Sequence, residues 1–162
     1  MQDPKFESDI YELLEQTNVN ASKFILEVTE SAVFINSANT NQLFKRLTDS
    51  GFRISVDDFG TGYSTLTHLR RFPISELKID RSFVDKIVTD AEDASIVDAM
   101  IGLGESLDID VVAEGVETQE VLEMLRKFGC HTIQGFLICK PIPLSEFRQW
   151  IESEALSRNK QA

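Results

Sequence analysis

The stretch Ile54-Ser55-Val56-Asp57-Asp58-Phe59-Gly60-Thr61-Gly62-Tyr63-Ser64 indicates how the rest of the chain is arranged. Its apolar and β-branched start, 54–56, is typical of a buried strand. Two adjacent carboxylates follow, and then a loop that contains two glycines and three hydroxyl residues. Carboxylates between a strand and a glycine loop suit a hard-cation site, but aspartates in an ordinary acidic turn give the same pattern. The stretch alone leaves both interpretations open.

Strand patterns and helix patterns alternate along the whole chain. Strands are expected at 24–30, 52–57, 77–80, 110–115 and 132–136. Helices are expected at 4–17 and around 66–71, and two more follow a polar loop at 36–40 and a polar stretch at 89–94. Two further helices are expected to begin at caps, Thr118 and Ser145. In the last of them Phe147, Trp150 and Ile151 are expected to face inward. This alternation predicts an α/β fold in which helices connect parallel strands. The absence of any linker or low-complexity segment predicts one unit.

Polar residues recur where the predicted strands end. They are Glu27, Asp57, Asp58, Lys78 with Asp80, Glu114 and Gln134. The C-terminal ends of the strands form one face of a (β/α) barrel, so these side chains are candidates to converge. Crowded carboxylates repel one another, and a divalent cation would relieve that repulsion. An all-oxygen ligand set favours Mg²⁺ or Mn²⁺, and two adjacent aspartates can hold two ions that activate water against a phosphoryl group.

Composition excludes several other classes of protein. The chain has 162 residues, 42% of them hydrophobic, which is enough for a buried core. A net charge of −11 argues against binding of DNA, RNA or an anionic membrane surface. The two cysteines, Cys130 and Cys139, form no disulfide framework, which favours a reducing, cytoplasmic setting. No apolar run approaches the roughly 18 residues of a spanning helix.

Five ordered motifs carry a resemblance to a known family. They are Glu27-Val28-Thr29-Glu30-Ser31, 57–64, Leu77-Lys78-Ile79-Asp80-Arg81-Ser82-Phe83, Val112-Ala113-Glu114-Gly115-Val116-Glu117-Thr118 and Gln134-Gly135-Phe136. Together they resemble the EAL domain, a family of bacterial phosphodiesterases that open cyclic-di-GMP to the linear dinucleotide pGpG. The resemblance implies a modified (β/α)8 barrel, two Mg²⁺ or Mn²⁺ ions and a homodimer.

The resemblance also implies a role for each matched residue. The implied metal ligands are Glu27 for the first ion, Asp57 as a bridge, and Asp58 and Glu114 for the second ion. The other implied site residues are Lys78 beside the attacking water, Gln134 near the metal-bound waters, Asp80, Glu117, and Glu30, which steadies the glycine loop. Lys78 is not assigned as the general base.

Part of the family pattern has no counterpart in the motifs of this chain. The Glu-Ala-Leu signature and an upstream asparagine, which bring further ligands to the first metal, are not matched, so about five of eight barrel strands are expected. Residues 1–157 are taken as the C-terminal portion of the domain and 158–162 as a polar tail. The strands near Ile25 and Gln134 would be open edges, covered by a second copy, covered by a partner, or left open in a distorted sheet. Little or no hydrolysis is expected from the chain alone. The alternative function is a non-catalytic module that binds cyclic-di-GMP or has a regulatory role.

Overall fold

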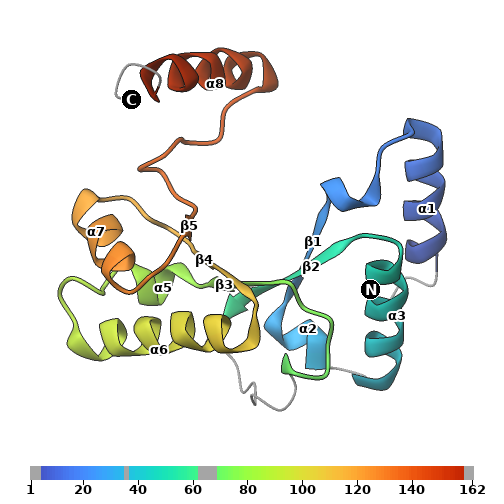
Figure 1. Cartoon of the computed structure of the whole chain (residues 1–162), viewed down its shortest axis with the longest axis horizontal. Coiled ribbons are helices and arrows are strands. Elements are labelled where there is room, and N and C mark those ends of the chain that lie inside the picture. The colour runs from blue at the N-terminus through green and yellow to red at the C-terminus, as the bar shows by residue number, and fades with distance from the viewer. Residues whose placement is uncertain (1–4, 35–36, 62–68, 159–162) are drawn as a thin grey trace.

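The chain folds around one parallel sheet with the strand order β1-β2-β3-β4-β5 (Figure 1). The structure is a computed structural model that describes residues 5–34, 37–61 and 69–158. The strands are β1 (Ile25–Thr29), β2 (Arg53–Phe59), β3 (Glu76–Ile79), β4 (Asp110–Ala113) and β5 (Thr132–Ile133). Every neighbouring pair is parallel, and a bulge between Val56 and Phe59 interrupts the β2–β3 register. The predicted α/β fold with parallel strands is confirmed.

Helices connect the strands and cover the outer face of the sheet. They are α1 (Phe6–Thr17), the 3-10 turn η1 (Ala21–Lys23), α2 (Glu30–Phe34), α3 (Ser37–Asp49), α5 (Arg81–Val84), α6 (Ala91–Leu107), α7 (Gln119–Lys127) and α8 (Leu144–Arg158). One part of the core gathers around Phe44, Leu47 and Ile54, and the other around Ile79, Val97 and Leu125. Within β2, Ile54 and Val56 pack into this core, so Ser55 and Asp57 point to the opposite face. That opposite face carries the candidate site.

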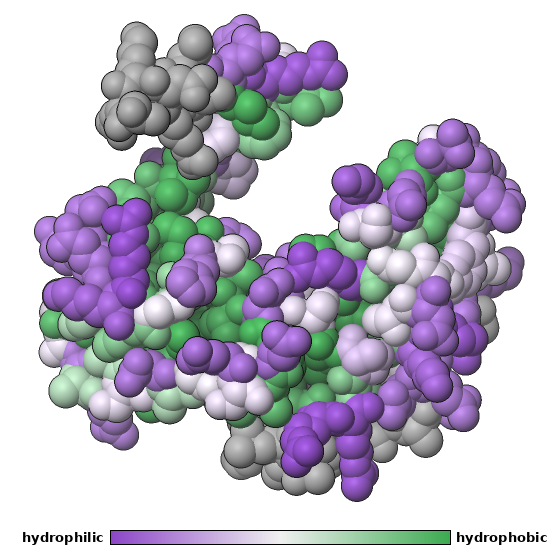
Figure 2. All heavy atoms as spheres, viewed as in Figure 1, coloured by the Kyte–Doolittle hydropathy of each residue, from purple (hydrophilic) through white to green (hydrophobic). Residues whose placement is uncertain are grey.

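The described strands form an open sheet with β1 and β5 at its edges. The edges predicted near Ile25 and Gln134 therefore lie where they were expected. Ile25 is 40% exposed because nothing in the described chain packs against that side of β1. Figure 2 shows a hollow between the part of the molecule that bears α8 and the part that bears α1.

Three predicted boundaries in the first two-thirds of the chain are wrong. The first strand ends at Thr29, and Glu30 begins α2, a helix that the sequence pattern did not indicate. Helix α3 begins at Ser37, inside the polar loop predicted at 36–40. Helix α6 begins at Ala91, inside the polar stretch at 89–94, because the Asp90 side chain accepts hydrogen bonds from the amides of Glu92 and Asp93.

The last helix does not pack as the sequence predicted. Helix α8 begins at Leu144, so Ser145 lies in its first turn and is not its cap. Phe147 and Ile151 are 40% and 46% exposed, and Phe147 stacks on Trp150 instead of entering a core. Figure 1 shows α8 standing away from the sheet, which agrees with the exposure of these two side chains. An amphipathic pattern predicts a buried face only where another element covers it.

Two other predictions concern the chain ends and the glycine loop. Arg158, the first residue of the polar tail predicted at 158–162, is the last residue of α8, and 159–162 lie outside the described residues. Half of the helix predicted at 66–71, together with Gly62, Tyr63 and Ser64, also lies outside them. In the described ranges, no helix combines the length and the apolar character needed to cross a membrane.

Two glycines of α6 give a matched test of the helix–sheet packing. A Cβ at Gly104 would overlap the Val111 side chain of β4 and lie 3.0 Å from the carbonyl oxygen of Ile109, whereas a Cβ at Gly102 would meet nothing within 4 Å. Gly102→Ala should stabilise the protein by about 0.5–1 kcal/mol through helix propensity. Gly104→Ala should destabilise it by about 1–3 kcal/mol, because overpacking outweighs the same propensity gain. Denaturant unfolding of both variants checks this, and equal effects of the two changes would contradict the packing.

Candidate active site

The strand ends meet around the ammonium group of Lys78. Its Nζ lies 2.6 Å from Glu114 Oε1, 3.2 Å from Glu27 Oε1 and 3.5 Å from Asp57 Oδ1. Glu27 comes from β1, Asp57 from β2 and Lys78 from β3, while Glu114 directly follows β4. The four predicted residues are therefore brought together by four different strands. We call Lys78 and these three carboxylates the Lys78 cluster.

Lys78 is buried, but it is held in its charged form. Only 5% of its side chain is exposed, compared with 17% for Glu114, 27% for Asp57 and 53% for Glu27. Burial lowers the pKa of Lys78, but hydrogen bonds to Glu114 and Glu27 and the charges of Glu114 and Asp57 outweigh this, so that its pKa lies above the ordinary value. At neutral pH the group is an ammonium ion, which can donate hydrogen bonds but cannot accept a proton.

Asp58 is next to the cluster in an unusual backbone conformation. Its φ of 56° lies in the left-handed region, and its amide donates a hydrogen bond of 3.1 Å to Asp57 Oδ1. Burial and the charges of Asp57 and Asp80 raise the pKa of Asp58, while the charge of Lys78 acts in the opposite direction. Three carboxylates thus crowd this corner, in agreement with the repulsion expected from the sequence.

Glu30 holds the start of the glycine loop. Its side chain is 2% exposed, and Oε2 accepts a hydrogen bond of 3.0 Å from the amide of Gly60. Gly60 has a φ of 101°, and a Cβ there would collide with the side chain of Met100. A glycine at this position therefore lets the chain turn close to α6, and the Glu30 carboxylate fixes that turn. The contact has the form implied for Glu30 by the resemblance.

Asp80 and Glu117 lie beside the cluster and have other partners. Asp80 caps α5 by accepting a hydrogen bond of 3.0 Å from the amide of Ser82. Glu117 Oε1 pairs with Arg81 at 3.0 Å, and Arg81 also pairs with Asp85 at 2.8 Å. A Cβ at Gly115 would overlap the Arg81 side chain, so this glycine lets Arg81 lie against the segment after β4. Neither acid belongs to the Lys78 cluster.

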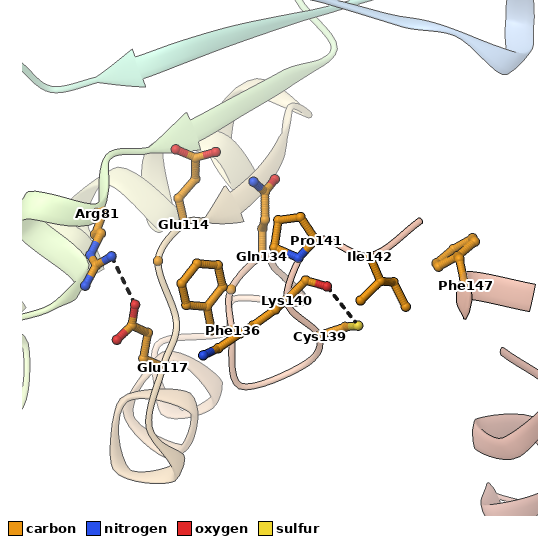
Figure 3. Close-up of a pocket in the computed structure, with 12 residues that line it drawn as sticks. Arg81, Glu114, Glu117, Gln134, Phe136, Cys139, Lys140, Pro141, Ile142 and Phe147 are labelled. Carbon is orange, nitrogen blue, oxygen red and sulfur yellow. Dashed lines mark hydrogen bonds and ion pairs between the residues drawn. The ribbon is translucent and has the colours of Figure 1, made fainter. Parts of the chain in front are cut away.

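A pocket of about 510 Å³ opens next to Glu114. Its walls include Arg81, Glu117, Gln134, Phe136 and Lys140 (Figure 3). Glu114 and Gln134 point in the same direction, and Phe136 lies between Glu117 and Lys140. The ammonium group of Lys140 lies 5.6 Å from the centre of the Phe136 ring. The pocket thus offers two cations and two partly exposed aromatic rings, Phe136 and Phe147, beside the carboxylates.

The sequence did not single out Arg81, Phe136 or Lys140 as lining residues. Arg81 and Phe136 stand inside the quoted motifs, but only their neighbours were assigned roles. Phe136 was placed at the end of the strand predicted at 132–136, but β5 ends at Ile133 and Phe136 is 51% exposed. Arg81 could not be found by spacing, since its place depends on the close approach to Gly115.

The donor chemistry of the site fits a hard divalent cation. Glu27, Asp57, Asp58 and Glu114 offer only carboxylate oxygens, the ligands that Mg²⁺ and Mn²⁺ prefer. A further polar atom lies close by: Ser55 Oγ is buried on the same face of β2 as Asp57, two residues away, and has no hydrogen-bond partner in the part of the chain described. In the described ranges, however, no three His, Cys, Asp or Glu side chains are gathered so that they could hold a metal ion. Three of the four carboxylates instead contact Lys78.

Comparison with known proteins identifies a family over most of the chain. The family model described as "EAL domain" matches residues 1–141. The letters Glu154-Ala155-Leu156 do occur in this sequence, but they lie in α8 and outside that match. They are therefore not the signature that gives the family its name, and that signature is not found in the matched residues.

Named relatives are longer than this chain. MucR of Pseudomonas aeruginosa, a bifunctional diguanylate cyclase and cyclic di-GMP phosphodiesterase, is 45% identical over 129 residues, which are 80% of this chain and 19% of MucR. PdeN of Escherichia coli, a probable cyclic di-GMP phosphodiesterase, is 38% identical over 147 residues, which are 91% of this chain and 28% of PdeN. The chain thus spans less than a fifth of MucR and less than a third of PdeN.

Solved structures agree with the fold. The PaMucR phosphodiesterase in complex with c-di-GMP matches with a TM-score of 0.87 and 40% identity, over 90% of this chain and 59% of that one. The EAL domain of Mycobacterium smegmatis DcpA matches with a TM-score of 0.87 and 35% identity, over 94% of this chain and 69% of that one. Klebsiella pneumoniae BlrP1 with manganese and c-di-GMP matches with a TM-score of 0.80 and 33% identity, over 86% of this chain and 36% of that one. Divalent metal and c-di-GMP therefore occur together in a structural relative.

The crowding at Asp58 can be measured without any ligand. Because the folded-state pKa of Asp58 is raised, its ionisation disfavours the folded state, and this penalty is absent below the unfolded pKa of about 3.9 and grows as pH rises. Asp58→Asn should therefore raise the free energy of unfolding in EDTA at pH 7 by less than about 1 kcal/mol, measured as a small rise in melting temperature. Asparagine also tolerates the left-handed φ. Near pH 3 the gain should disappear.

The control for this prediction is Asp98→Asn, which removes one charge at an exposed position of α6. Thermal unfolding at both pH values compares the two variants. A gain of equal size in Asp98→Asn, or a gain in Asp58→Asn that does not depend on pH, would show that local crowding is not the cause.

Proposed function

The chain belongs to the EAL domain family, and on that premise we propose that its Lys78 cluster is part of the hydrolytic site of a cyclic-di-GMP phosphodiesterase. The observation that carries the proposal is the meeting of Glu27, Asp57 and Glu114 around Lys78 at the C-terminal ends of parallel strands. In barrels of parallel strands, chemistry is found at these ends. The reaction proposed is attack of water on one phosphodiester bond of c-di-GMP, which yields linear pGpG.

Two divalent ions, Mg²⁺ or Mn²⁺, would be held by the carboxylates. Glu27 and Asp57 would bind the first ion, and Asp57, Asp58 and Glu114 the second. When bound, such ions polarise the phosphodiester and make a coordinated water acidic. The raised pKa of Asp58 supports this assignment, because a crowded carboxylate gains from a nearby cation.

The residues of the chain itself would orient the reactants. The Lys78 ammonium would donate hydrogen bonds to the attacking water, and Gln134 would do the same for waters near its amide. Asp80 and Glu117 would complete the polar wall, and Glu30 would keep the glycine loop in place through Gly60. Lys78 does not serve as the base, since its pKa is raised and the group stays protonated at neutral pH.

The pocket beside Glu114 would receive part of the dinucleotide. A phosphodiester is an anion, and the chain carries a net charge of −11, so binding needs local positive charge. Arg81 and Lys140 supply it in the pocket wall, and Phe136 offers a ring on which a base could stack. The substrate would thus lie between these cations and the metal-binding carboxylates.

We expect weak turnover from the chain alone. Among the motifs matched here, Glu27 and Asp57 are the only carboxylates assigned to the first ion. Three carboxylates, Asp57, Asp58 and Glu114, are assigned to the second ion. A chain that holds the second ion better than the first would bind c-di-GMP more readily than it hydrolyses it. The second candidate function, a non-catalytic c-di-GMP module, is favoured by this same imbalance.

The assembly and setting proposed are a homodimer in the cytoplasm. The helices after Asp58 and Lys78 would form the dimer surface; of these, α5 is described, and Val88 just beyond it is 46% exposed. DNA, RNA and membrane lipid are not proposed as partners, because the charge of −11 opposes binding to anionic surfaces. Light scattering at micromolar concentration should give the mass of two chains, and a folded monomer would count against the dimer.

Binding of c-di-GMP in the presence of Mn²⁺ tests the proposed function. Asp57→Ala should weaken that binding by about a hundredfold or more, since the carboxylate assigned to both ions is lost. Asp98→Ala, an exposed change of equal charge on α6, should leave binding unchanged. Calorimetry measures both, and chromatography of the reaction mixture for pGpG measures turnover. Absence of c-di-GMP binding in the wild-type chain, with or without Mn²⁺, would refute the function.

A further inference from the structure

The Lys78 cluster has one cation and three anions in contact. Glu114, Glu27 and Asp57 all place an oxygen within 3.5 Å of the same Nζ. The shortest of these contacts, 2.6 Å to Glu114, also involves the most buried of the three carboxylates, at 17% exposure. A buried ammonium with this number of anionic partners is a strong local interaction, because screening by water is weak there.

The carboxylates that contact Lys78 are also those assigned to the divalent ions. The proposed function assigns Glu27, Asp57 and Glu114 to divalent ions, yet in the structure each of them contacts Lys78. This explains why no group of three acidic, His or Cys side chains in the described ranges is arranged to hold a metal. Each carboxylate keeps other lone pairs, but an ammonium and a divalent ion that share the same three carboxylates repel each other and compete for the same negative charge.

The charge balance of the site also points to a second cation. Lys78 offsets one of the three negative charges that it touches, and Asp58 and Asp80 add two more within electrostatic reach of each other. A divalent ion would offset more charge than the lysine does, in a smaller volume. The single charge of Lys78 offsets part of the repulsion in the cluster, and a divalent ion, which has the larger charge, could replace it there.

We propose that Lys78 is an internal counter-ion that occupies the carboxylate cluster in the metal-free chain and is displaced when a divalent cation binds. This inference rests on the proposed function for the identity of the metal ligands. Displacement removes Nζ from Glu114 and Glu27, so the ammonium becomes available to substrate and water only when the metal is in place. The lysine thereby keeps the metal-free chain folded and couples its own catalytic position to metal binding.

A neutral residue at position 78 tests the role of Lys78 as a counter-ion, because it removes the charge that competes with the metal. Lys78→Met keeps a long side chain but removes the competing charge, so Mn²⁺ should bind about tenfold tighter or more in calorimetry without nucleotide. In EDTA the variant should melt at a lower temperature than the wild type, because the carboxylates have lost their counter-ion, and Mn²⁺ should raise that temperature by more than it does in the wild type.

The matched control is Lys86→Met. Lys86 is 62% exposed, and its Nζ is 4.0 Å from Asp93, so the change removes the same charge far from the cluster. It should alter neither Mn²⁺ affinity nor the stabilisation by Mn²⁺. Mn²⁺ binding in Lys78→Met that is no tighter than in the wild type, or absent from both, would overturn the proposal.

A second measurement needs only the wild-type chain. An ion-paired, buried ammonium exchanges its protons slowly, so Lys78 should give a ¹⁵N–H₃⁺ resonance in EDTA that Lys78→Arg lacks. Saturating Mg²⁺ should shift this resonance strongly or broaden it through faster exchange. A resonance that stays unchanged when Mg²⁺ is bound would show that the lysine is not displaced. Neither test contains c-di-GMP, so a chain that passes them but fails to bind c-di-GMP refutes the proposed function and leaves this inference standing.

Discussion

Lys78 can meet three carboxylates because β1, β2, β3 and β4 run parallel, so that their C-terminal ends reach one edge of the sheet. Thr29 pairs with Asp57 and Lys78 pairs with Val112, so Glu27 and Glu114 each lie two residues from these pairs along their strands and reach Nζ with their longer side chains. Like charges placed this closely would drive the strand ends apart without a cation among them. The fold and the site therefore depend on the same interaction.

The sheet face that carries the Lys78 cluster has a second group of ion pairs. At the N-terminal ends of the strands, an Arg53 guanidinium nitrogen lies 2.6 Å from Asp110 and 3.7 Å from Glu76. Glu76 and Lys78 are two residues apart on β3, so the two ion clusters share one face. Between them lies the buried hydroxyl of Ser55, for which the described residues offer no hydrogen-bond partner. Apolar packing is left to the other face, where Ile54, Val56 and Ile79 are fully buried against the helices.

Glycines set how closely the segments around the site can approach one another. Gly60 allows the chain after Asp58 to pass α6, and Gly115 allows Arg81 to lie across the segment after β4 and reach Glu117. Without the approach at Gly115 the pocket beside Glu114 would lose the wall that Arg81 forms. The left-handed φ of Asp58, Gly60 and Gly115 shows that this corner is built by backbone conformations that most residues avoid.

Local patterns in the sequence predicted the order of the five strands, their parallel arrangement and the acidic residues at the C-terminal edge of the sheet. These predictions were possible because periodicity and strand-end position are local properties. The sequence also predicted the cap at Thr118, whose hydroxyl accepts a hydrogen bond from the amide of Val121. It did not predict α2, the start of α3 or the exposure of α8, since these depend on what each segment packs against. The contacts of Lys78 with its carboxylates, and of Arg81 with Glu117, could be seen only in the tertiary structure. The reason is physical: distances between residues far apart in the chain follow from sheet register and backbone approach, which no single stretch of sequence contains.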